Sequence, residues 1–275
     1  MKVEYREWAP IPALSGRIEA IWSLSGQALP GAGPQRILPD GCSELILNFG
    51  DPVEQVHATD LLRQPLMLFV GQLQGPLFIR PTGRIDQLGI RFRPAGAAGF
   101  IREPQSRLIG EGLPLGDLAP RLARALGQRL FEITDPGRRV TAVQNALLQA
   151  VLAGSSPIAA VADRLVRSWG LAPVEQLARD AGLSGRQLAR RFLADVGVRP
   201  KLLARICRFQ RVFHALEGGS GPWARVAAEC GYYDSSHLIR DFHEPAGEAP
   251  ARLIDAAPAL TRVFTRARRA ADNAA

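Results

Sequence analysis

The sequence predicts an α+β protein of two domains, a β-rich amino-terminal domain with flanking helices and an all-α carboxy-terminal domain. Its 275 residues exceed the usual length of one domain. Short apolar or alternating runs separated by Gly and Pro fill the first part of the chain, whereas apolar residues at helical spacing fill the second. No segment approaches the roughly 18 consecutive apolar residues of a membrane span, so we expect no membrane association.

Three short apolar runs predict strands in the first part of the chain. They are Leu45–Phe49, Leu66–Val70 and Leu88–Phe92. Turn residues separate such runs, for example Pro39-Asp40-Gly41 and Pro81-Thr82-Gly83. We expect a small antiparallel sheet or barrel between residues 37 and 93, with one helix contributed by the opening segment.

Apolar residues then recur at helical spacing from about residue 115 to residue 152. Leucines four residues apart begin at Leu118, and a second apolar series begins at Val140 after a break at Thr134–Gly137. Two amphipathic helices fit this spacing. The linker that follows ends in Ser156, an expected N-cap, and Pro157, which suits a first helical position. The expected division of the chain is 1–153, 158–258 and a basic tail at 259–275.

Basic residues are concentrated in the carboxy-terminal part of the chain. Residues 158–275 hold 18 Lys and Arg against 12 Asp and Glu, whereas residues 1–157 hold 16 against 14. A basic domain attracts the phosphates of nucleic acid. A solvated basic surface would show the same excess of Lys and Arg. The sequence motifs are therefore needed to distinguish nucleic-acid binding from a solvated surface.

An internal repeat lies in this basic region. Its two copies are residues 174–184 and residues 223–234. In each copy a short helix ends at a glycine, Gly182 or Gly231, which can adopt the left-handed conformation of a helix stop. An N-cap follows, Ser184 in the first copy and Asp234 in the second, and opens a second helix. Each copy therefore predicts a helix-turn-helix unit.

The second helix of each unit has a buried face and an exposed face. Leu188 with Phe192, and Leu238 with Phe242, lie on the buried face, and Ser184 with Gln187 forms an S-x-x-Q capping box. Such a helix enters the major groove amino end first. The candidate DNA-binding residues are Ser184, Gly185, Arg186, Gln187, Arg190 and Arg191 in the first unit and Ser235, Ser236, His237 and Arg240 in the second. A helical hairpin with a merely solvated face is the alternative, and two copies in register favour DNA.

The segment Gly231–Phe242, with Gly247 and Pro250, resembles the signature of AraC/XylS transcriptional regulators. In that family a long rigid helix joins two helix-turn-helix units, and Pro200–Glu217 resembles that helix. The resemblance implies that residues 158–258 bind a bipartite site on double-stranded DNA with halves about one helical turn apart. It also makes Arg205 and Arg208 candidates for phosphate contacts. Glu244-Pro245 replaces the basic residues commonly found after Phe242.

Residues 38–45 and 88–94 resemble uncharacterised amino-terminal domains that accompany this DNA-binding module. In the wider family such domains are cupin-like barrels that sense small molecules or dimerise. The resemblance therefore implies a sensor or dimerisation domain, with a small-molecule effector, a homodimer and RNA polymerase as partners. A constitutive regulator that only dimerises through the helices at 118–151 is an open alternative. An enclosed, partly apolar pocket would favour the effector, and a filled core would favour the alternative.

The histidines and cysteines do not predict a catalytic, metal or cofactor site. His57 is the only histidine before the helical region, and Cys42, Cys207 and Cys230 are dispersed without a CxxC pair. A DNA-alkylation repair regulator with Cys42 as the alkyl acceptor is a further alternative, but its four-cysteine zinc site cannot be built here. An amino terminus without the apolar region of a secretory signal predicts a cytoplasmic protein.

Overall fold

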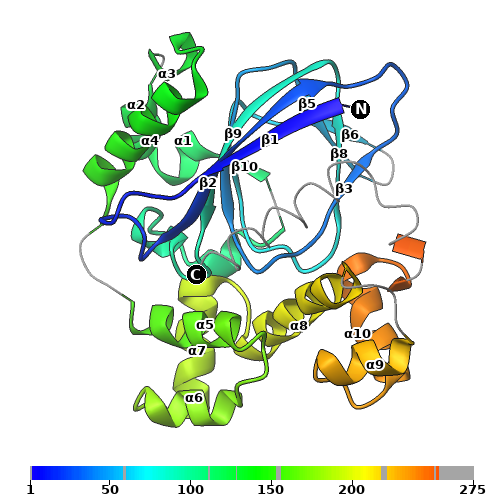
Figure 1. The fold of residues 1–275 in the computed structure, drawn as a ribbon. Coiled ribbons are helices and arrows are strands. Elements are labelled where there is room, and N and C mark those ends of the chain that lie inside the picture. Colours follow the sequence, from blue (N-terminus) through cyan, green and yellow to red (C-terminus); the bar gives the residue numbers. More distant parts are fainter. Residues whose placement is uncertain are drawn as a thin grey trace.

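The computed structural model describes residues 2–57, 60–110, 112–127, 129–152, 156–217, 222–250 and 252–253. A β-rich half precedes a helical half, as Figure 1 shows, and this confirms the predicted α+β fold class. The predicted basic tail at 259–275 lies outside the described residues. Within those residues, no helix is both long and apolar enough to cross a membrane.

Ten strands among the described residues form two antiparallel sheets. The strands are β1 Lys2–Trp8, β2 Ile18–Gln27, β3 Gln35–Ile37, β4 Glu44–Asn48, β5 Val53–Val56, β6 Leu61–Arg63, β7 Met67–Val70, β8 Leu77–Pro81, β9 Arg84–Phe92 and β10 Gly112–Pro114. The larger sheet has the order β1-β2-β9-β4-β7-β10, and the smaller has the order β3-β8-β5-β6. The two sheets do not close into one barrel, so the sheet is the correct choice between the two predicted forms.

The start of the chain differs from the prediction. The opening segment is the strand β1, which pairs with β2 from Lys2↔Gln27 to Trp8↔Ile21, so the helix expected there is wrong. The prediction also placed the first strand near residue 37 and missed both β1 and β2. Because β1 is an edge strand, charged residues alternate with apolar ones along it, and it lacks the apolar run that marks a buried strand.

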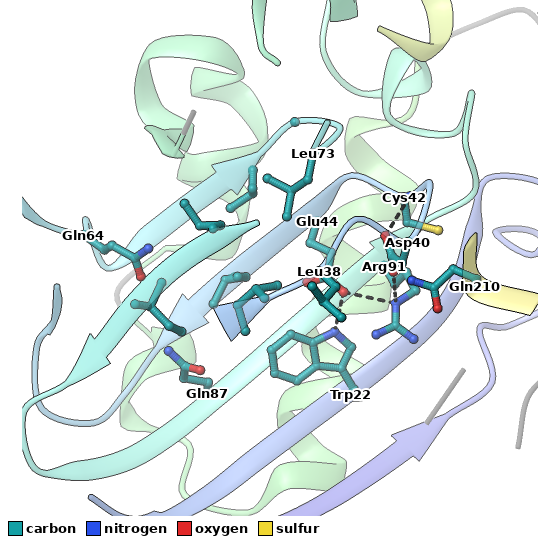
Figure 2. A pocket seen from close by; sticks show the side chains of 16 residues that line it. Trp22, Leu38, Asp40, Cys42, Glu44, Gln64, Leu73, Gln87, Arg91 and Gln210 are labelled. Carbon is teal, nitrogen blue, oxygen red and sulfur yellow. Dashed lines mark hydrogen bonds and ion pairs between the residues drawn. The ribbon is translucent and has the colours of Figure 1, made fainter. Parts of the chain in front are cut away.

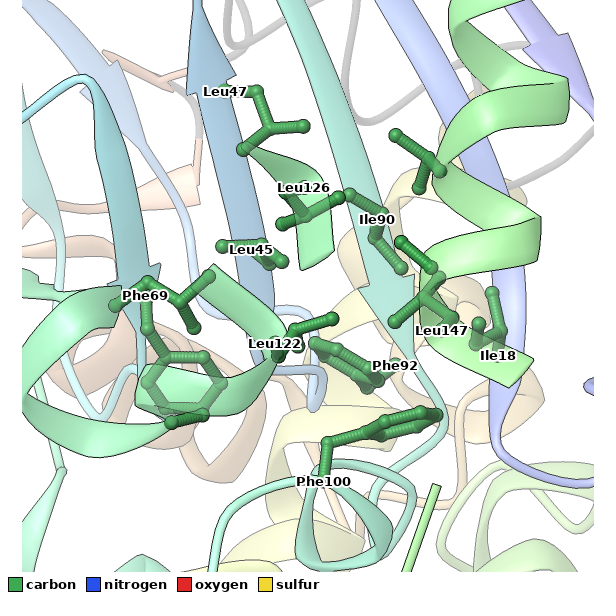
Figure 3. Packing of buried hydrophobic residues seen from close by; sticks show 14 of the residues in the cluster. Ile18, Leu45, Leu47, Phe69, Ile90, Phe92, Phe100, Leu122, Leu126 and Leu147 are labelled. Carbon is green, nitrogen blue, oxygen red and sulfur yellow. The ribbon is translucent and has the colours of Figure 1, made fainter. Parts of the chain in front are cut away.

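The alternation of side chains along the strands sorts residues between the two faces of the larger sheet. One face carries Leu45, Leu88 and Phe92 and packs on the helices that follow the sheet (Figure 3). The opposite face carries Trp22, which packs against Val53 and Ile79 of the smaller sheet. The β-rich half therefore has three layers, with the larger sheet in the middle.

The helical segment beside the larger sheet contains more helices than predicted. They are α1 Leu115–Leu118, α2 Pro120–Leu126, α3 Arg129–Glu132 and α4 Pro136–Ala150, and two 3-10 turns precede them at Ala97–Gly99 (η1) and Gln105–Arg107 (η2). The first predicted helix is divided because Pro120 starts a new helix and Gly127, with a φ of 51°, ends it. The second is α4, and the side chain of Asp135 caps it.

The helical half contains six further helices among the described residues. They are α5 Pro157–Arg167, α6 Val174–Asp180, α7 Gly185–Val196, α8 Pro200–Glu217, α9 Trp223–Glu229 and α10 Ser235–Ala246. Ser156 caps α5 as predicted, and α8 spans the predicted linker helix. The predicted boundary between 153 and 158 falls between α4 and α5 and stays a prediction.

The loop between β3 and β4 is seated on α8. The Gln210 side chain donates a hydrogen bond from Nε2 to the carbonyl oxygen of Pro39 at 2.5 Å. Leu38 packs with Phe209 of α8, and a Cβ placed on Gly41 would lie 2.9 Å from the Cδ1 atom of Leu203. The amino-terminal half and the linker helix therefore share a close-packed interface.

Gly89 of β9 provides a test of the packing between the two sheets. A Cβ at this position would lie 2.0 Å from Cε2 of Trp22, which is 1% exposed. We expect Gly89→Ala to lower the free energy of unfolding by about 1–3 kcal/mol through overpacking. Urea denaturation measures this change. Gly16→Ala is the matched control, because no atom lies within 4 Å of a Cβ there, and an equal effect of both substitutions would contradict the explanation.

Candidate functional site

The first helix-turn-helix unit consists of α6, a turn and α7. Gly182 ends α6 with a φ of 66°. Ser184 caps α7, and its Oγ accepts a hydrogen bond from the Gln187 backbone N–H, while the Gln187 side chain accepts from the Ser184 backbone N–H. Leu188 and Phe192 are fully buried and hold α7 against α5 and α8. These contacts confirm the predicted turn, capping box and buried face.

The second unit repeats this arrangement with α9 and α10. Gly231 has a φ of 78°, and Asp234 accepts a hydrogen bond from the His237 backbone N–H at 2.7 Å. Leu238 and Phe242 are buried, and the ring centroids of Phe242 and Phe209 lie 4.7 Å apart. Helix α8 thus contributes to the cores of both units and fixes their spacing.

The exposed face of α7 carries cations without partners. Arg186, Arg190 and Arg191 are exposed, and within the described part of the chain they make no hydrogen bond or ion pair. Ser184 and Gln187 are also exposed, but their side chains are engaged in the capping box. Of the six residues predicted on this helix, the three arginines are therefore the ones whose side chains are available to DNA.

Gly185, the first residue of α7, is exposed and has open space around it. No atom lies within 4 Å of a Cβ built at this position. The amino end of α7 therefore presents its backbone without a covering side chain. Backbone N–H groups at a helix start attract phosphate oxygens.

The exposed face of α10 is less basic. Ser236 and Arg240 are exposed, and Ser235 is partly buried. His237 is also partly buried, and its ring meets the Tyr232 ring edge-on with the centroids 5.3 Å apart. The position of His237 favours packing within the turn over contact with a base.

Arg205 and Arg208 point from α8 to α10. Arg205 Nε lies 3.3 Å from Asp241 Oδ1, and Arg205 also pairs with Glu244. Arg208 lies 3.4 Å from Asp241 Oδ2 and donates to the carbonyl oxygen of Gly170 at 3.2 Å. Each arginine side chain is 21% exposed. These pairs explain why an acidic residue stands at 244. They favour a positioning role for both arginines. The phosphate contacts of Arg205 and Arg208 stay a prediction.

Tyr233 is a candidate that the sequence analysis missed. It is 93% exposed and directly precedes the N-cap Asp234, whereas the neighbouring Tyr232 is buried. An exposed aromatic ring beside a recognition helix can contact sugar or base atoms. The sequence alone does not distinguish the two tyrosines, because which of them is buried depends on the packing of the turn.

A cavity of about 70 Å³ lies between the two sheets, beside α8. Its walls are mainly apolar and include Trp22, Ile46, Leu73, Leu77 and Ile79. Its polar end is formed by Asp40, Glu44, Arg91 and Gln210 (Figure 2). On this measure the cavity has room for about five water molecules.

The polar end contains a buried cluster centred on Arg91. Glu44 and Arg91 lie opposite each other in β4 and β9, and Arg91 donates from Nε to Glu44 Oε1 at 3.1 Å. Trp22 donates to the same oxygen at 3.0 Å, and Asp40 Oδ2 lies 3.5 Å from Arg91 Nε (Figure 2). Burial raises the pKa of Glu44. Although burial opposes charge on Arg91, the charges of Glu44 and Asp40 raise its pKa well above the usual value, so this arginine stays charged.

The sequence predicts no role for this cluster. Glu44 and Arg91 lie in the segments that resemble an amino-terminal domain of regulators, and Pro39-Asp40-Gly41 predicts a turn. A charged residue inside an apolar strand, as in Leu88-Gly89-Ile90-Arg91-Phe92, was the available signal, because such a residue must find a partner when the strand is buried.

Cys42 lines the cavity and does not reach the surface. It is 4% exposed, and its Sγ lies 3.5 Å from Glu19 Oε2. A DNA alkyl group cannot contact a thiol in this position without a rearrangement. Among the described residues there is also no group of three or more His, Cys, Asp or Glu that could hold a metal ion.

Two family models match the chain. A domain of unknown function (DUF6597) matches residues 6–114, which cover the two sheets. A helix-turn-helix domain matches residues 177–256, which cover both units and the helix between them. The carboxy-terminal part of the chain is therefore a helix-turn-helix domain of the AraC type. A domain of this type makes the chain an AraC-like DNA-binding transcription regulator.

Three of the solved structures to which the chain is similar have low sequence identity and TM-scores below 0.5. A 1.65 Å structure of ToxT from Vibrio cholerae is 9% identical, with 91% of this chain and 96% of that chain covered and a TM-score of 0.45. ToxT from Vibrio cholerae O395 is 10% identical, with 94% and 98% covered and a TM-score of 0.44. The AraC-like transcriptional activator CuxR is 14% identical, with 79% and 82% covered and a TM-score of 0.30. None of the curated proteins matches the sequence.

The ion pairs between α8 and α10 allow the two roles of Arg205 to be separated. If Arg205 positions α10, Arg205→Met and Asp241→Asn will be coupled by about 0.5–1 kcal/mol in unfolding free energy. The slope of the logarithm of DNA affinity against the logarithm of salt concentration will then be unchanged in Arg205→Met. Urea denaturation of the four proteins of the cycle and DNA binding at several salt concentrations measure both quantities.

Arg190→Met is the matched control, because Arg190 is exposed and has no partner among the described residues. If Arg190 contacts a phosphate, its replacement should reduce the slope by about 0.9. The same reduction in Arg205→Met would show that Arg205 contacts a phosphate after all.

Proposed function

We propose that this AraC-like regulator binds a bipartite DNA site through α7 and α10, under the control of a small molecule in the cavity between the sheets. The observation that carries this proposal is the position of Gln210. This residue belongs to α8, which joins the two helix-turn-helix units, and it also lines the cavity and binds Pro39. The same helix is therefore in contact with the DNA-binding units and the effector site.

The DNA-binding part of the proposal rests on the exposed starts of α7 and α10. Arg186, Arg190 and Arg240 are long enough to reach guanine or phosphate, and Ser236 lies near the amino end of α10. Because α8 packs in the cores of both units, the two helices are held at a constant separation. Such a pair suits two successive major-groove segments about one helical turn apart.

The two helices should contribute unequally to DNA affinity. Helix α7 presents three arginines without partners among the described residues, whereas the exposed arginine of α10 is Arg240. The acids of α10, Asp241 and Glu244, are engaged with α8. Counterion release increases with the number of phosphates contacted. We therefore expect the half-site bound by α7 to supply most of the salt-dependent affinity.

The cavity favours effector control over a constitutive regulator. A filled core between the sheets was the expectation for a domain that only dimerises, and the space between Trp22, Leu73 and Leu77 is instead open. Small-molecule sites are typically concave and mainly apolar, with few polar groups. Dimerisation remains compatible with this function, because Leu148 and Val151 at the end of α4 are 38% and 36% exposed. Contact with RNA polymerase and a cytoplasmic location follow from the same role.

The loop at residues 38–42 connects the cavity to α8. Asp40 faces Arg91 inside the cavity, the carbonyl of Pro39 accepts from Gln210, and Gly41 lies against Leu203. A ligand that displaces Asp40 must therefore move this loop or α8. Close-packed interfaces of this kind respond by changing between discrete arrangements rather than by deforming gradually.

Selection of bound sites from random double-stranded DNA tests the DNA-binding part. We expect a motif with two halves about one helical turn apart. Arg190→Ala should relax one half and Arg240→Ala the other, each at a cost of about 1–3 kcal/mol if the arginine binds guanine. Arg121→Ala, on the exposed face of α2, should leave the motif unchanged. A single undivided motif, or loss of the same half in both variants, would contradict the assignment of one half to each helix.

Filling the cavity tests the effector-control part. Leu77→Phe places a larger side chain in the cavity wall and should change affinity for the selected site by about fivefold or more, because it imitates part of the effect of a ligand. In a Gln210→Ala background the same substitution should have little effect, since the contact with α8 is lost. Leu29→Phe, at a position that is 58% exposed, is the control. Unchanged DNA affinity of a folded Leu77→Phe protein would contradict control through this cavity.

A further inference from the structure

The polar end of the cavity indicates which kind of molecule it binds. Building on the proposed function, we infer that the ligand is an uncharged, mainly apolar molecule with a carbonyl oxygen that accepts a hydrogen bond from Arg91. Three observations support this inference: the apolar walls, the charge balance of the lining, and a buried donor of Arg91 that has no acceptor in the part of the chain that the structure describes.

The walls select an apolar ligand body. Ile37, Ile46, Leu73, Leu77 and Ile79 line the cavity together with the ring of Trp22. These side chains come from both sheets and from the loop after β7, so they surround the space rather than forming one flat face. Transfer of apolar surface from water into such a space is favourable.

The charge balance opposes a ligand carboxylate. Arg91 is the only cation of the described lining, and the acids Asp40 and Glu44 both lie against its Nε, at 3.5 and 3.1 Å. A carboxylate that approached Arg91 would become a third acid around one guanidinium group. The free-energy cost of desolvating this carboxylate would not be offset, because the positive charge of Arg91 is already neutralised by Asp40 and Glu44. The nearby Glu19, whose carboxylate lies 3.5 Å from the Cys42 sulfur, makes the surroundings more acidic.

The unsatisfied donor favours a ligand that brings an acceptor. Nη1 of Arg91 is buried and has no hydrogen-bond partner among the described residues, although the side chain is 2% exposed and ion-paired through Nε. A buried donor without an acceptor raises the free energy of the folded protein. A carbonyl oxygen accepts this hydrogen bond without adding a charge. An ammonium group has only donors and would leave Nη1 without a partner.

Three probes with the same chain length and different head groups test the inference on the unmodified protein. They are 2-pentanone, pentanoate and pentylammonium, which are small enough for the cavity, and their binding at neutral pH is measured by titration calorimetry. We expect 2-pentanone to bind about tenfold more tightly than pentanoate, with pentylammonium weaker than the ketone. Affinity of pentanoate or pentylammonium equal to or higher than that of the ketone would overturn the inferred ligand class and would leave the effector site itself in place.

A variant pair then tests the role of Arg91. Arg91→Met alone would leave the buried carboxylate of Glu44 without its cation, so it is combined with Glu44→Gln, while Asp40, whose side chain is 24% exposed, stays unchanged. The double variant should bind 2-pentanone no more tightly than the hydrocarbon pentane, whereas the unmodified protein should prefer the ketone. A ketone preference that persists in the folded double variant would show that Arg91 is not the donor. If the double variant does not fold, the order of the three probes on the unmodified protein decides.

Absence of binding by all three probes would overturn the ligand class. If Leu77→Phe then also left DNA affinity unchanged, control through the cavity would fail as well. A change in DNA affinity with Leu77→Phe, in contrast, would leave the cavity as the control site and exclude only this chemistry of the ligand.

Discussion

Helix α8 packs against three parts of the chain, and the position of each depends on it. Leu203 and Cys207 belong to the core of the first helix-turn-helix unit, and Phe209 and Val212 belong to the core of the second. Gln210 reaches the turn after β3. A helix that is buried on several sides cannot shift without changing more than one interface, because side chains interdigitate at close to crystalline density. The spacing of the recognition helices and the position of the sheets therefore both depend on the packing of α8.

The cluster around Arg91 is costly to maintain in a protein of this size. A buried ion pair often adds no net stability compared with apolar residues of similar volume, because desolvation of both charges offsets their attraction. Here the cost is greater, since Nη1 has no acceptor within the described residues and two acids share one cation. Apolar side chains would fill the same space between β4 and β9. A charged cluster at the polar end of a mainly apolar cavity is more typical of a binding site than of a structural core.

The helix-turn-helix units could be predicted from the sequence because their determinants are local. The contact between Ser184 and Gln187 spans three residues, and the left-handed conformation of Gly182 or Gly231 depends on one residue. The cavity could not be predicted in this way. Glu44 and Arg91 are 47 positions apart and meet only through strand register, and Pro39 and Gln210 are separated by 171 positions. The direction in which Arg205 points likewise depended on which side of α8 the second unit covers.

The two helix-turn-helix units contact the amino-terminal half at different places, and only one of these places adjoins lining residues of the cavity. Ile37 and Leu38 line the cavity, and the adjacent Arg36 pairs with Glu248 and donates to the carbonyl of Ala246 at 3.3 Å, at the end of α10. The first unit instead meets the amino-terminal half at η2, where a Cβ on Gly197 would lie 3.0 Å from the Gln105 carbonyl oxygen.

Because Arg36 is adjacent to the lining residue Ile37, a change in the cavity reaches the end of α10 directly. It reaches α7 only through α8, where Gly41 contacts Leu203, or through η2. The arginines without partners among the described residues are on α7, and the acids paired with α8 are on α10. Under the proposed function, α7 therefore supplies affinity that depends little on the ligand. The ligand acts mainly by aligning α10 with the second half of the DNA site, so that occupancy of the cavity changes how much of the bipartite site is bound.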